Sequence, residues 1–314
     1  MNRFDNFYYH GQNHEVNDLL QTIPLEYKKL GKIMILSHNT ATTVFRIVGE
    51  HDYALKIVHN CGEDTDRWRS SKREIEILQR LFDCNHVVRL IDSKLDNETN
   101  VMVLLEEYCE PLSNFCAMTV FDAIGVCTDV CDALIECRNA GIAHLDVKLE
   151  NILIDINHVV RLGDFGVSLP LEEMADNSTK RGTIRYMAPE VLREGKCSEQ
   201  SEIYSVGLLL YLLFNRGTYE WKDGCGEISY YQRLAGMPLE SVHIDDEIDS
   251  AIMRIVNKAC NFTPQDRHEC FENLKDDLIS LRMMISETAG NTLLILNSSL
   301  MDMTLPPIIA GEMS

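Results

Sequence analysis

Reactive side chains gather in two short stretches of this chain. One carries Asp146, Lys148 and Asn151 in the series Asp-x-Lys-x-x-Asn, and the other opens an Asp-Phe-Gly triplet with Asp164. A carboxylate can take a proton from a hydroxyl group, and carboxylate and amide oxygens are the ligands that Mg²⁺ prefers. An ammonium group balances the negative charge of a phosphate. Together these side chains can accept a proton, hold a divalent ion and neutralise an anion.

The order and spacing of four motifs resemble those of the eukaryotic-type protein kinases. The first, His-x-Asp-x-Lys-x-x-Asn, begins at His144, and the Asp-Phe-Gly triplet follows a strand-like run that ends at Leu162. The third, residues 182–190, ends in Ala-Pro-Glu, and the fourth contributes Arg267. The resemblance implies a buried ion pair between Arg267 and Glu190. One such motif is weak evidence, whereas four in the family's order are specific.

The resemblance spans residues 27–284 and implies an α+β fold with two lobes. The small lobe is expected to be an antiparallel β-sheet with one helix, and the larger lobe to be mostly helical. The expected organisation is an N-terminal extension (1–26), a small lobe (27–106), a hinge (107–111), a large lobe (112–284) and a C-terminal tail (285–314). The apolar tail could pack on the domain, cover its groove or dock a partner, and we favour packing.

Local patterns predict the elements that must position the reactive side chains. Runs rich in β-branched residues and bounded by turn residues predict strands, at 33–36, 43–48, 53–58, 87–91 and 100–105. Apolar residues at helical spacing predict helices, at 67–81, 119–140, 246–260 and 267–284. The run 205–214 is so apolar that we expect a buried helix there.

The resemblance also implies a role for each reactive side chain. Asp146 is the implied catalytic base, and Lys148 is implied to neutralise the γ-phosphate of ATP. Asn151 and Asp164 are the implied ligands of Mg²⁺. Thr183 stands where the family's threonine bonds the catalytic aspartate and lysine. The Asp-x-Lys spacing resembles that of serine/threonine kinases rather than tyrosine kinases.

A second set of residues is implied to bind ATP. Lys56 lies in Tyr-Ala-Leu-Lys, which resembles the family's strand lysine, and Glu74 stands where a helix glutamate pairs with that lysine. Glu76 is the alternative, but the pattern Glu-x-x-Ile-Leu selects Glu74. The full implied set is Lys56, Glu74, Ser37, Asn39, Val44, Ala54, Glu107, Cys109 and Leu153.

The glycine-rich loop of the family is missing. Ser37, Asn39 and Thr42 occupy the positions of its three glycines. A non-glycine residue in the left-handed conformation costs about 1–2 kcal/mol. We therefore expect either weaker ATP binding or a loop of another shape.

Two further positions depart from the family pattern. Leu145 replaces the arginine that normally receives a phosphate on the activation segment. We therefore expect that activity does not require phosphorylation of Ser178 or Thr179. Glu202 replaces an aspartate that holds the backbone of the catalytic loop, and its longer side chain puts that geometry in question.

Composition bounds the class of protein. The chain has 314 residues, of which 45% are hydrophobic and 25% charged, as in a folded globular protein. Its formal net charge of -20 argues against nucleic acid or an anionic membrane as a partner. The eleven cysteines include no Cys-x-x-Cys pair, so we expect buried thiols in a reducing compartment rather than disulfides or a Cys/His metal site. The sequence carries no signal peptide, and we expect a cytoplasmic protein.

These observations support one reading and two alternatives. The preferred reading is a serine/threonine protein kinase that uses ATP and Mg²⁺ to phosphorylate a protein substrate. A pseudokinase that acts as a regulatory scaffold is the alternative suggested by the missing glycines and by Leu145. A kinase fold that acts on a small molecule is the third, and the intact segment 182–190 argues against it because it resembles a platform for a peptide substrate.

Overall fold

The computed structural model describes residues 20–62, 65–96, 100–115, 117–174, 180–215, 220–221, 224–225, 228–244 and 246–295. Contacts divide the chain into two compact units. Unit 1 contains the residues up to Lys72 and those from Leu90 to Tyr108, and unit 2 contains Arg73–Arg89 and the residues from Cys109 onward. Each unit is described by itself. The domain boundaries predicted from the sequence stay predictions.

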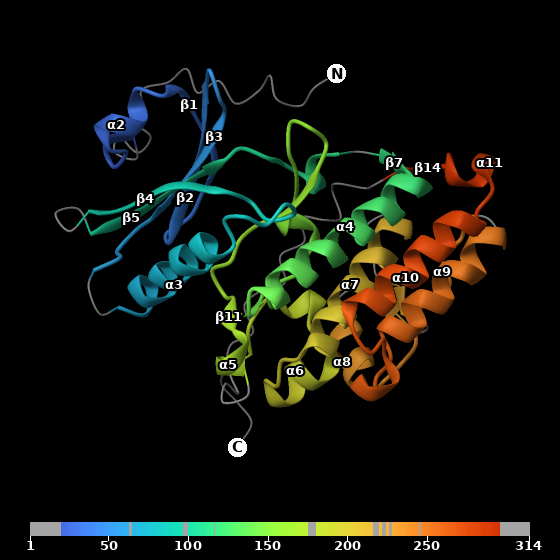
Figure 1. Cartoon of the computed structure of the whole chain (residues 1–314). Coiled ribbons are helices and arrows are strands. Elements are labelled where there is room, and N and C mark those ends of the chain that lie inside the picture. Colours follow the sequence, from blue (N-terminus) through green and yellow to red (C-terminus); the bar gives the residue numbers. More distant parts are fainter. Residues whose placement is uncertain are drawn as a thin grey trace. The chain divides into compact units, whose positions relative to one another are not determined.

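Unit 1 is built on a five-stranded antiparallel sheet (Figure 1). Its strands are β1 (Gly31–His38), β2 (Thr42–Gly49), β3 (Tyr53–Val58), β4 (Leu90–Asp96) and β5 (Val101–Glu107). They lie in the order β1-β2-β3-β5-β4. The predicted antiparallel sheet is therefore confirmed.

Alternation along the strands separates the two faces of this sheet. Alternate residues of β2 and β3 are fully buried in one apolar cluster, namely Phe45, Ile47, Leu55 and Ile57. The short helix α2 (Leu25–Lys28) adds Tyr27 to that cluster. Because successive side chains of a strand point to opposite faces, the residues between them, among them Val44 and Lys56, lie on the other face.

Helix α3 (Asp66–Arg80) crosses the boundary between the units. After it, the chain does not enter β4 as early as the sequence predicts. Val87 instead makes a parallel bridge to Leu162 in unit 2, where the N–H of Val88 donates to the Leu162 carbonyl at 3.0 Å. The predicted strand 87–91 was therefore wrong at its start, because its first residues pair with a segment that lies far along the chain.

Four helices form the core of unit 2 (Figure 1). They are α4 (Val120–Asn139), α7 (Glu199–Phe214), α9 (Asp246–Ala259) and α10 (Phe271–Met284). Thirteen of the sixteen residues of α7 are buried, which confirms the predicted buried helix. Thr119 and Asp122 form a capping box at the start of α4, and Gly141, with φ of 74°, follows its end.

Shorter elements surround this core. The strands of unit 2 are β6 (Glu110–Pro111), β7 (Ala117–Thr119), β8 (Ile142–Ala143), β9 (Ile152–Ile154), β10 (Val160–Leu162), β11 (Leu169–Pro170), β12 (Glu220–Trp221), β13 (Gly224–Cys225) and β14 (Leu293–Ile295). The short helices are η2 (Leu112–Asn114), η3 (Leu149–Asn151), α5 (Leu171–Met174), η4 (Ile184–Tyr186), α6 (Pro189–Glu194), α8 (Ile228–Leu234), η5 (Pro264–Asp266) and α11 (Glu287–Gly290).

The first part of the predicted tail packs on unit 2. Strand β14 pairs antiparallel with β7, and Leu294 is buried. A Cβ at Gly290 would overlap the ring of Phe121 at the start of α4, so only glycine allows this approach. Residues 296–314 lie outside the described part of the chain.

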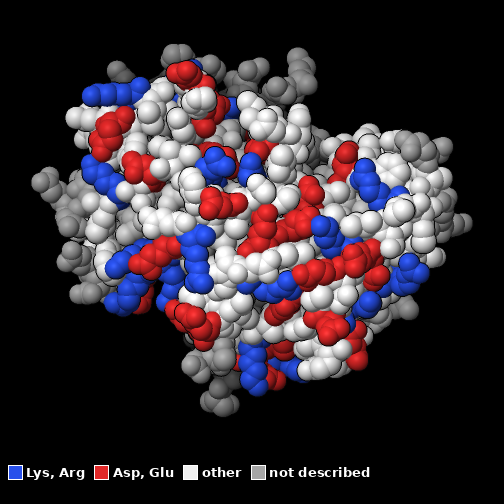
Figure 2. All heavy atoms as spheres, in the orientation of Figure 1, with Lys and Arg blue, Asp and Glu red and all other residues white. Residues whose placement is uncertain are grey.

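Charged side chains lie on the surface, and several cysteines lie in the core of unit 2. Acidic and basic side chains are interspersed on the face in Figure 2, and ion pairs such as Lys275–Asp132 link α10 to α4. All the described cysteines are free thiols, and Cys127, Cys131 and Cys137 of α4 are buried. No helix in the described ranges is both long and apolar enough to cross a membrane.

Candidate active site

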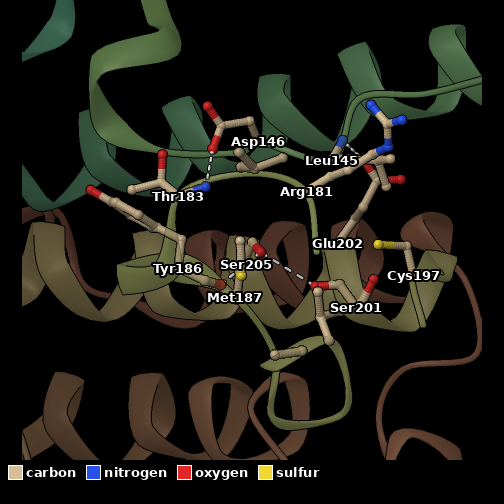
Figure 3. Close-up of a pocket in the computed structure, with 13 residues that line it drawn as sticks. Leu145, Asp146, Arg181, Thr183, Tyr186, Met187, Cys197, Ser201, Glu202 and Ser205 are labelled. Atoms are coloured by element: carbon tan, nitrogen blue, oxygen red, sulfur yellow. Dashed lines mark hydrogen bonds between the residues drawn. The ribbon is translucent and has the colours of Figure 1, made fainter. Parts of the chain in front are cut away.

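Asp146 lies at the centre of a set of polar contacts within unit 2. One carboxylate oxygen, Oδ1, accepts the N–H of Thr183 at 2.6 Å (Figure 3). The other, Oδ2, accepts from Nζ of Lys148 at 2.6 Å and from Nδ2 of Asn151 at 3.2 Å. Lys148 also donates to Oγ1 of Thr183 at 3.1 Å. The predicted contacts of Thr183 with Asp146 and Lys148 are therefore present.

Two small ladders hold the segments that carry these residues. Strands β9 and β10 pair so that Ile152 lies opposite Leu162, and the next N–H, that of Gly163, donates to the carbonyl of Asn151 at 2.9 Å. Asn151 lies directly before β9, and Asp164 lies two residues after the end of β10, so this pairing positions both. Strands β8 and β11 close the other end, with Ala143 opposite Leu169. The two predicted metal ligands thus come from paired backbone segments.

His144 fixes the loop from inside. Its Nε2 lies 3.0 Å from the Gly163 carbonyl, which can only accept, and its Nδ1 lies 3.2 Å from the N–H of Asp146, which can only donate. These partners require a neutral ring with the proton on Nε2. Burial lowers the pKa of His144, in agreement with a neutral ring. The ring also packs edge-on against Phe165 at 4.8 Å.

Glu202 of α7 supports the backbone of the same loop. Its Oε1 accepts the N–H of His144 at 2.9 Å and that of Leu145 at 2.8 Å. Leu145 itself has a positive φ of 67°, a conformation that non-glycine residues rarely adopt. The longer glutamate therefore does hold the loop backbone. Burial raises the pKa of the Glu202 carboxyl to about 7.

The left-handed residue of the Asp-Phe-Gly triplet is Asp164, with φ of 60°. Gly166 does not have a positive φ, although a Cβ there would lie 3.4 Å from Oδ1 of Asp164 and 3.7 Å from Oε2 of Glu74. The carboxylates of Asp164 and Glu74 therefore both lie against Gly166 within unit 2. Glu74 is only 2% exposed, whereas Glu76 is exposed, so the burial pattern agrees with the choice of Glu74.

A small pocket lies between the catalytic loop, the segment 182–190 and α7 (Figure 3). Leu145, Arg181 and Glu202 line it, together with Cys197. The Nε of Arg181 is buried and has no hydrogen-bond partner among the described residues. Burial and the charge of Arg73 lower the pKa of Arg181. The sequence did not single out Arg181, yet it brings a guanidinium to the pocket that Leu145 lines.

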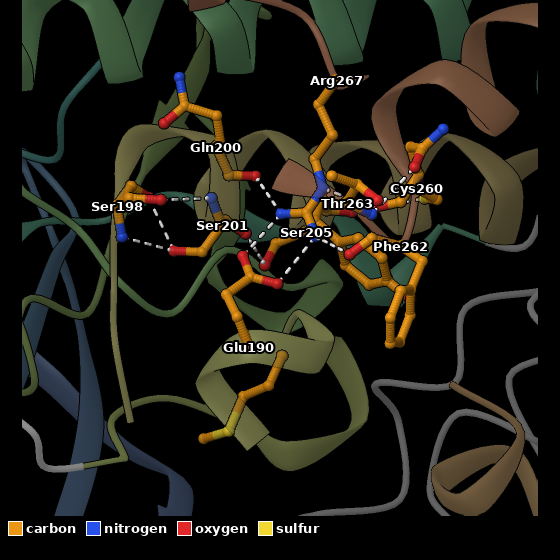
Figure 4. A network of polar contacts seen from close by, with 12 residues as sticks. Glu190, Ser198, Gln200, Ser201, Ser205, Cys260, Phe262, Thr263 and Arg267 are labelled. Carbon is orange, nitrogen blue, oxygen red and sulfur yellow. Dashed lines mark hydrogen bonds and ion pairs between the residues drawn. The ribbon is translucent and has the colours of Figure 1, made fainter. Parts of the chain in front are cut away.

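The buried ion pair between Arg267 and Glu190 is present (Figure 4). The guanidinium donates to both carboxylate oxygens of Glu190, at 2.7 and 2.8 Å. It also donates to the carbonyls of Asn261 at 2.7 Å and Gln200 at 2.8 Å, and it lies over the ring of Tyr204. This network ties the end of the segment 182–190 to α7 and to the loop before α10.

Several predicted nucleotide-binding residues share one face of the sheet in unit 1. Val44 lies opposite Lys56, and Lys56 lies opposite Leu104 of β5. Ala54, two residues before Lys56, points to the same side. Ser37 lies opposite Val44 after a β-bulge in β1. Antiparallel pairing therefore brings these side chains together.

The turn between β1 and β2 has another shape, which is one of the two outcomes expected from the missing glycines. The N–H of Asn39 donates to the carbonyl of Thr42 at 2.9 Å, and Oδ1 of Asn39 accepts the N–H groups of Ala41 and Thr42 at 2.8 and 2.9 Å. No positive φ occurs at Ser37, Asn39 or Thr42. These three positions therefore carry no left-handed strain, because a side chain that mimics a backbone acceptor closes a tight turn.

The other predicted nucleotide-binding residues are placed as follows. Glu107 ends β5 in unit 1, opposite Tyr53. In unit 2, Cys109 is buried, and Leu153 lies on β9 opposite Arg161, with its side chain against Gly163. Their roles in nucleotide binding stay predictions.

A separate cluster in unit 2 contains His86, Asp129 and Asp132, whose ligand atoms lie within 4.8 Å of one another. Asp132 already pairs with Nζ of Lys275 at 2.5 Å, and His86 lies 3.5 Å from Glu136. A cation is thus supplied by the protein itself, and we assign no metal ion to this cluster.

The chain resembles known proteins over most of its length. The model of the protein kinase domain matches residues 38–279. The chain is 30% identical over 256 residues to probable serine/threonine-protein kinase gdt2 of Dictyostelium discoideum, which covers 74% of this chain and 14% of that protein. It is 34% identical over 147 residues to serine/threonine-protein kinase PknL of Mycobacterium tuberculosis, which covers 46% of this chain and 37% of PknL.

A third relative is serine/threonine-protein kinase PknB of Mycobacterium tuberculosis, 28% identical over 166 residues, which covers 52% of this chain and 26% of PknB. The chain thus spans 14–37% of the length of these relatives. The family match itself covers more than half of the chain and includes every motif described above. By this match and by the geometry of Asp146, Lys148 and Thr183, the chain belongs to the eukaryotic-type protein kinase family.

Proposed function

We propose that this chain is an active protein kinase that transfers the γ-phosphoryl group of ATP to serine or threonine hydroxyls of proteins. The observation that carries the proposal is the set of three donors around the Asp146 carboxylate, from Thr183, Lys148 and Asn151. These hydrogen bonds engage both carboxylate oxygens and so fix the orientation of the Asp146 side chain. A scaffold protein has no need for such an oriented carboxylate, whereas a general base does.

The donor chemistry fits Mg²⁺ and ATP. Asn151 and Asp164 offer hard oxygen atoms from two paired segments, and Mg²⁺ prefers such ligands. When bound, Mg–ATP supplies the phosphoryl group and a divalent charge that offsets the phosphate charge. We propose that Asn151 and Asp164 hold the ion.

Each residue of the site has a proposed task. Asp146 orients the acceptor hydroxyl and takes its proton at a carboxylate oxygen, and Lys148 balances the charge that moves with the γ-phosphoryl group. Thr183 positions both side chains, because its N–H donates to Asp146 and its Oγ1 accepts from Lys148. On the sheet of unit 1, Lys56 is proposed to contact the α- and β-phosphates of ATP.

Serine and threonine are the proposed acceptors for two reasons. The Asp-x-Lys series is typical of serine/threonine kinases, and the relatives compared above are all named as such. The intact segment 182–190, with its anchored Glu190, supports a peptide acceptor rather than a small molecule.

Labelled ATP tests the proposal. Purified protein is incubated with γ-labelled ATP and a basic protein substrate, with Mg²⁺ and with a chelator. We expect label on serine or threonine in the presence of Mg²⁺ only. Label on tyrosine would contradict the proposed acceptor, and label on an added aminoglycoside alone would favour a small-molecule kinase.

The alternative is a pseudokinase that acts as a scaffold. The glycine-free turn at Asn39 is the observation that favours it, since phosphates are normally approached by a glycine-rich backbone. Absence of Mg²⁺-dependent label in any product would favour this alternative.

A further inference from the structure

Arg233 is a buried arginine that sequence reasoning did not single out. It lies in α8, which packs against α6 (Figure 1), and it is only 2% exposed. One terminal nitrogen, Nη1, donates to the carbonyl of Ile184 at 3.0 Å and to that of Met187 at 2.9 Å. Arg233, 46–49 positions farther along the chain, therefore bonds to the first residue of η4 and to the residue directly after it.

The surroundings of Arg233 do not favour a charge. No carboxylate in the described part of the chain pairs with it, and its Nε is buried without a hydrogen-bond partner. Arg233 and Arg267 both lie near Tyr204 and Cys260, and the nearby Glu190 carboxylate is bonded to Arg267. A buried guanidinium that lacks a counter-charge destabilises the fold relative to an apolar side chain of similar size. The position is therefore not explained by stability alone.

Its two acceptors belong to the turn that follows Thr183. Within η4, the N–H of Tyr186 donates to the Thr183 carbonyl and that of Met187 to the Ile184 carbonyl. The hydroxyl of Tyr186 accepts the N–H of Leu149 in the catalytic loop at 3.3 Å. Arg233 thus bonds to a turn whose Tyr186 hydroxyl contacts the catalytic loop at Leu149.

The side chains that this turn presents include an exposed apolar one. Ile184 is 36% exposed, and Arg185 beside it is half-buried. Their direction depends on the two carbonyls that Arg233 holds, because a change in those peptide planes rotates the neighbouring side chains. We infer that Arg233 is a positioning residue that shapes the surface on which the acceptor peptide lies, a role that rests on the proposed kinase function.

The inference predicts a separation of kinetic constants. Replacing Arg233 should raise KM for the acceptor protein, and it should leave KM for ATP and the ATPase rate without acceptor near the wild-type values. Lysine keeps the charge and can still reach one carbonyl, so Arg233→Lys should restore part of the loss that Arg233→Met produces. Arg254, exposed on α9, supplies the matched control Arg254→Met.

The experiment combines kinetics with hydrogen exchange of the full chain. In Arg233→Met we expect KM for the acceptor to rise about tenfold, and the amides of Tyr186 and Met187 to exchange about tenfold faster, since two charge-assisted hydrogen bonds are lost. Arg233→Lys should fall between this variant and wild type, and Arg254→Met should match wild type.

Each result decides a separate point. Unchanged exchange at Tyr186 and Met187 would overturn the inference whether or not the protein is active. An equal rise of both KM values, or loss of kcat alone, would assign Arg233 a general structural role and overturn it too. If the wild-type protein transfers no phosphate but Arg233→Met still shows faster exchange, the proposed function is rejected. Arg233 would then stabilise η4 without any role in binding an acceptor, and the inference would be overturned. If Arg233→Met does not fold, Arg233→Lys carries both measurements.

Discussion

The ion pair between Arg267 and Glu190 permits a quantitative prediction. The Arg267 side chain is fully buried and that of Glu190 is 13% exposed. Replacing Arg267 by methionine keeps most of the apolar stem and removes every donor. Glu190 then loses its cation, and the carbonyls of Asn261 and Gln200 lose a donor that reaches them at 2.7 and 2.8 Å.

Removal of one partner of a buried ion pair costs about 3–5 kcal/mol, since the other charge stays buried without compensation. At about 2–4 °C per kcal/mol for a domain of this size, Tm should fall by about 6–20 °C. Urea unfolding followed by circular dichroism measures the free energy of unfolding, and calorimetry measures Tm. The double variant Glu190→Gln/Arg267→Met should cost less than the sum of its two single changes.

An exposed pair provides the control. Lys258 and Asp277 lie 3.3 Å apart with side chains 46% and 44% exposed, so Lys258→Met should cost less than about 1 kcal/mol. If Arg267→Met also costs less than about 1 kcal/mol, or if the Glu190 and Arg267 changes add independently, the reasoning about burial is wrong.

Three further changes test other parts of the site. Gly182→Ala should lower the transfer rate by about 10²-fold, because Gly182 has φ of 95° and a Cβ there would overlap the carbonyl of Leu145; activity within a factor of about two of wild type would be inconsistent with this contact. Burial raises the pKa of the Glu202 carboxyl from 4.5 to about 7, so the folded protein binds this proton more tightly than the unfolded chain does. The protonated carboxyl therefore adds to the free energy of unfolding in full below about pH 4.5, and this contribution is lost as the pH rises through 7. Glu202→Gln should remove that dependence, worth on the order of 3 kcal/mol between pH 4.5 and 8 in urea unfolding, and parallel pH profiles would disprove it. Replacement of Ser178 and Thr179, which lie outside the described residues, by alanine should leave the transfer rate near wild type, whereas its collapse would show that phosphorylation is needed despite Leu145.

Local pattern was enough to predict most of the longer helices and strands. The β-branched runs marked the strands of unit 1, and the apolar run 205–214 marked the buried helix α7. The helix 119–140 was bounded correctly, because Thr119 caps its start and Gly141 supplies the left-handed residue after its end. These signals are local, so the sequence carries them directly.

The arrangement around Asp146 was predicted for another reason. The resemblance to the kinase family implied which residues must meet, and the contacts of Thr183 with Asp146 and Lys148 agree. The same reasoning gave the Arg267–Glu190 pair, although these residues are 77 positions apart. Sequence spacing alone does not contain such contacts, and the family resemblance supplied them.

What failed or was missed depends on contacts without a local signal. Val87 pairs with Leu162 and delays β4. Asn39 closes its turn with its own side chain, a loop shape that the missing glycines allowed but did not specify. Arg181 and Arg233 reach their places from segments that show no motif, and no pattern in the sequence marks either of them.

The transfer rate of Asp146→Asn tests the central claim most directly. Asparagine keeps the size of the side chain and removes its ability to take a proton, and calorimetry on both proteins establishes whether ATP binding is retained. With ATP binding unchanged, we predict that kcat for phosphorylation of a protein acceptor falls by about 10²–10⁴-fold. Equal rates for Asp146→Asn and wild type would contradict the assignment of Asp146 as the catalytic base.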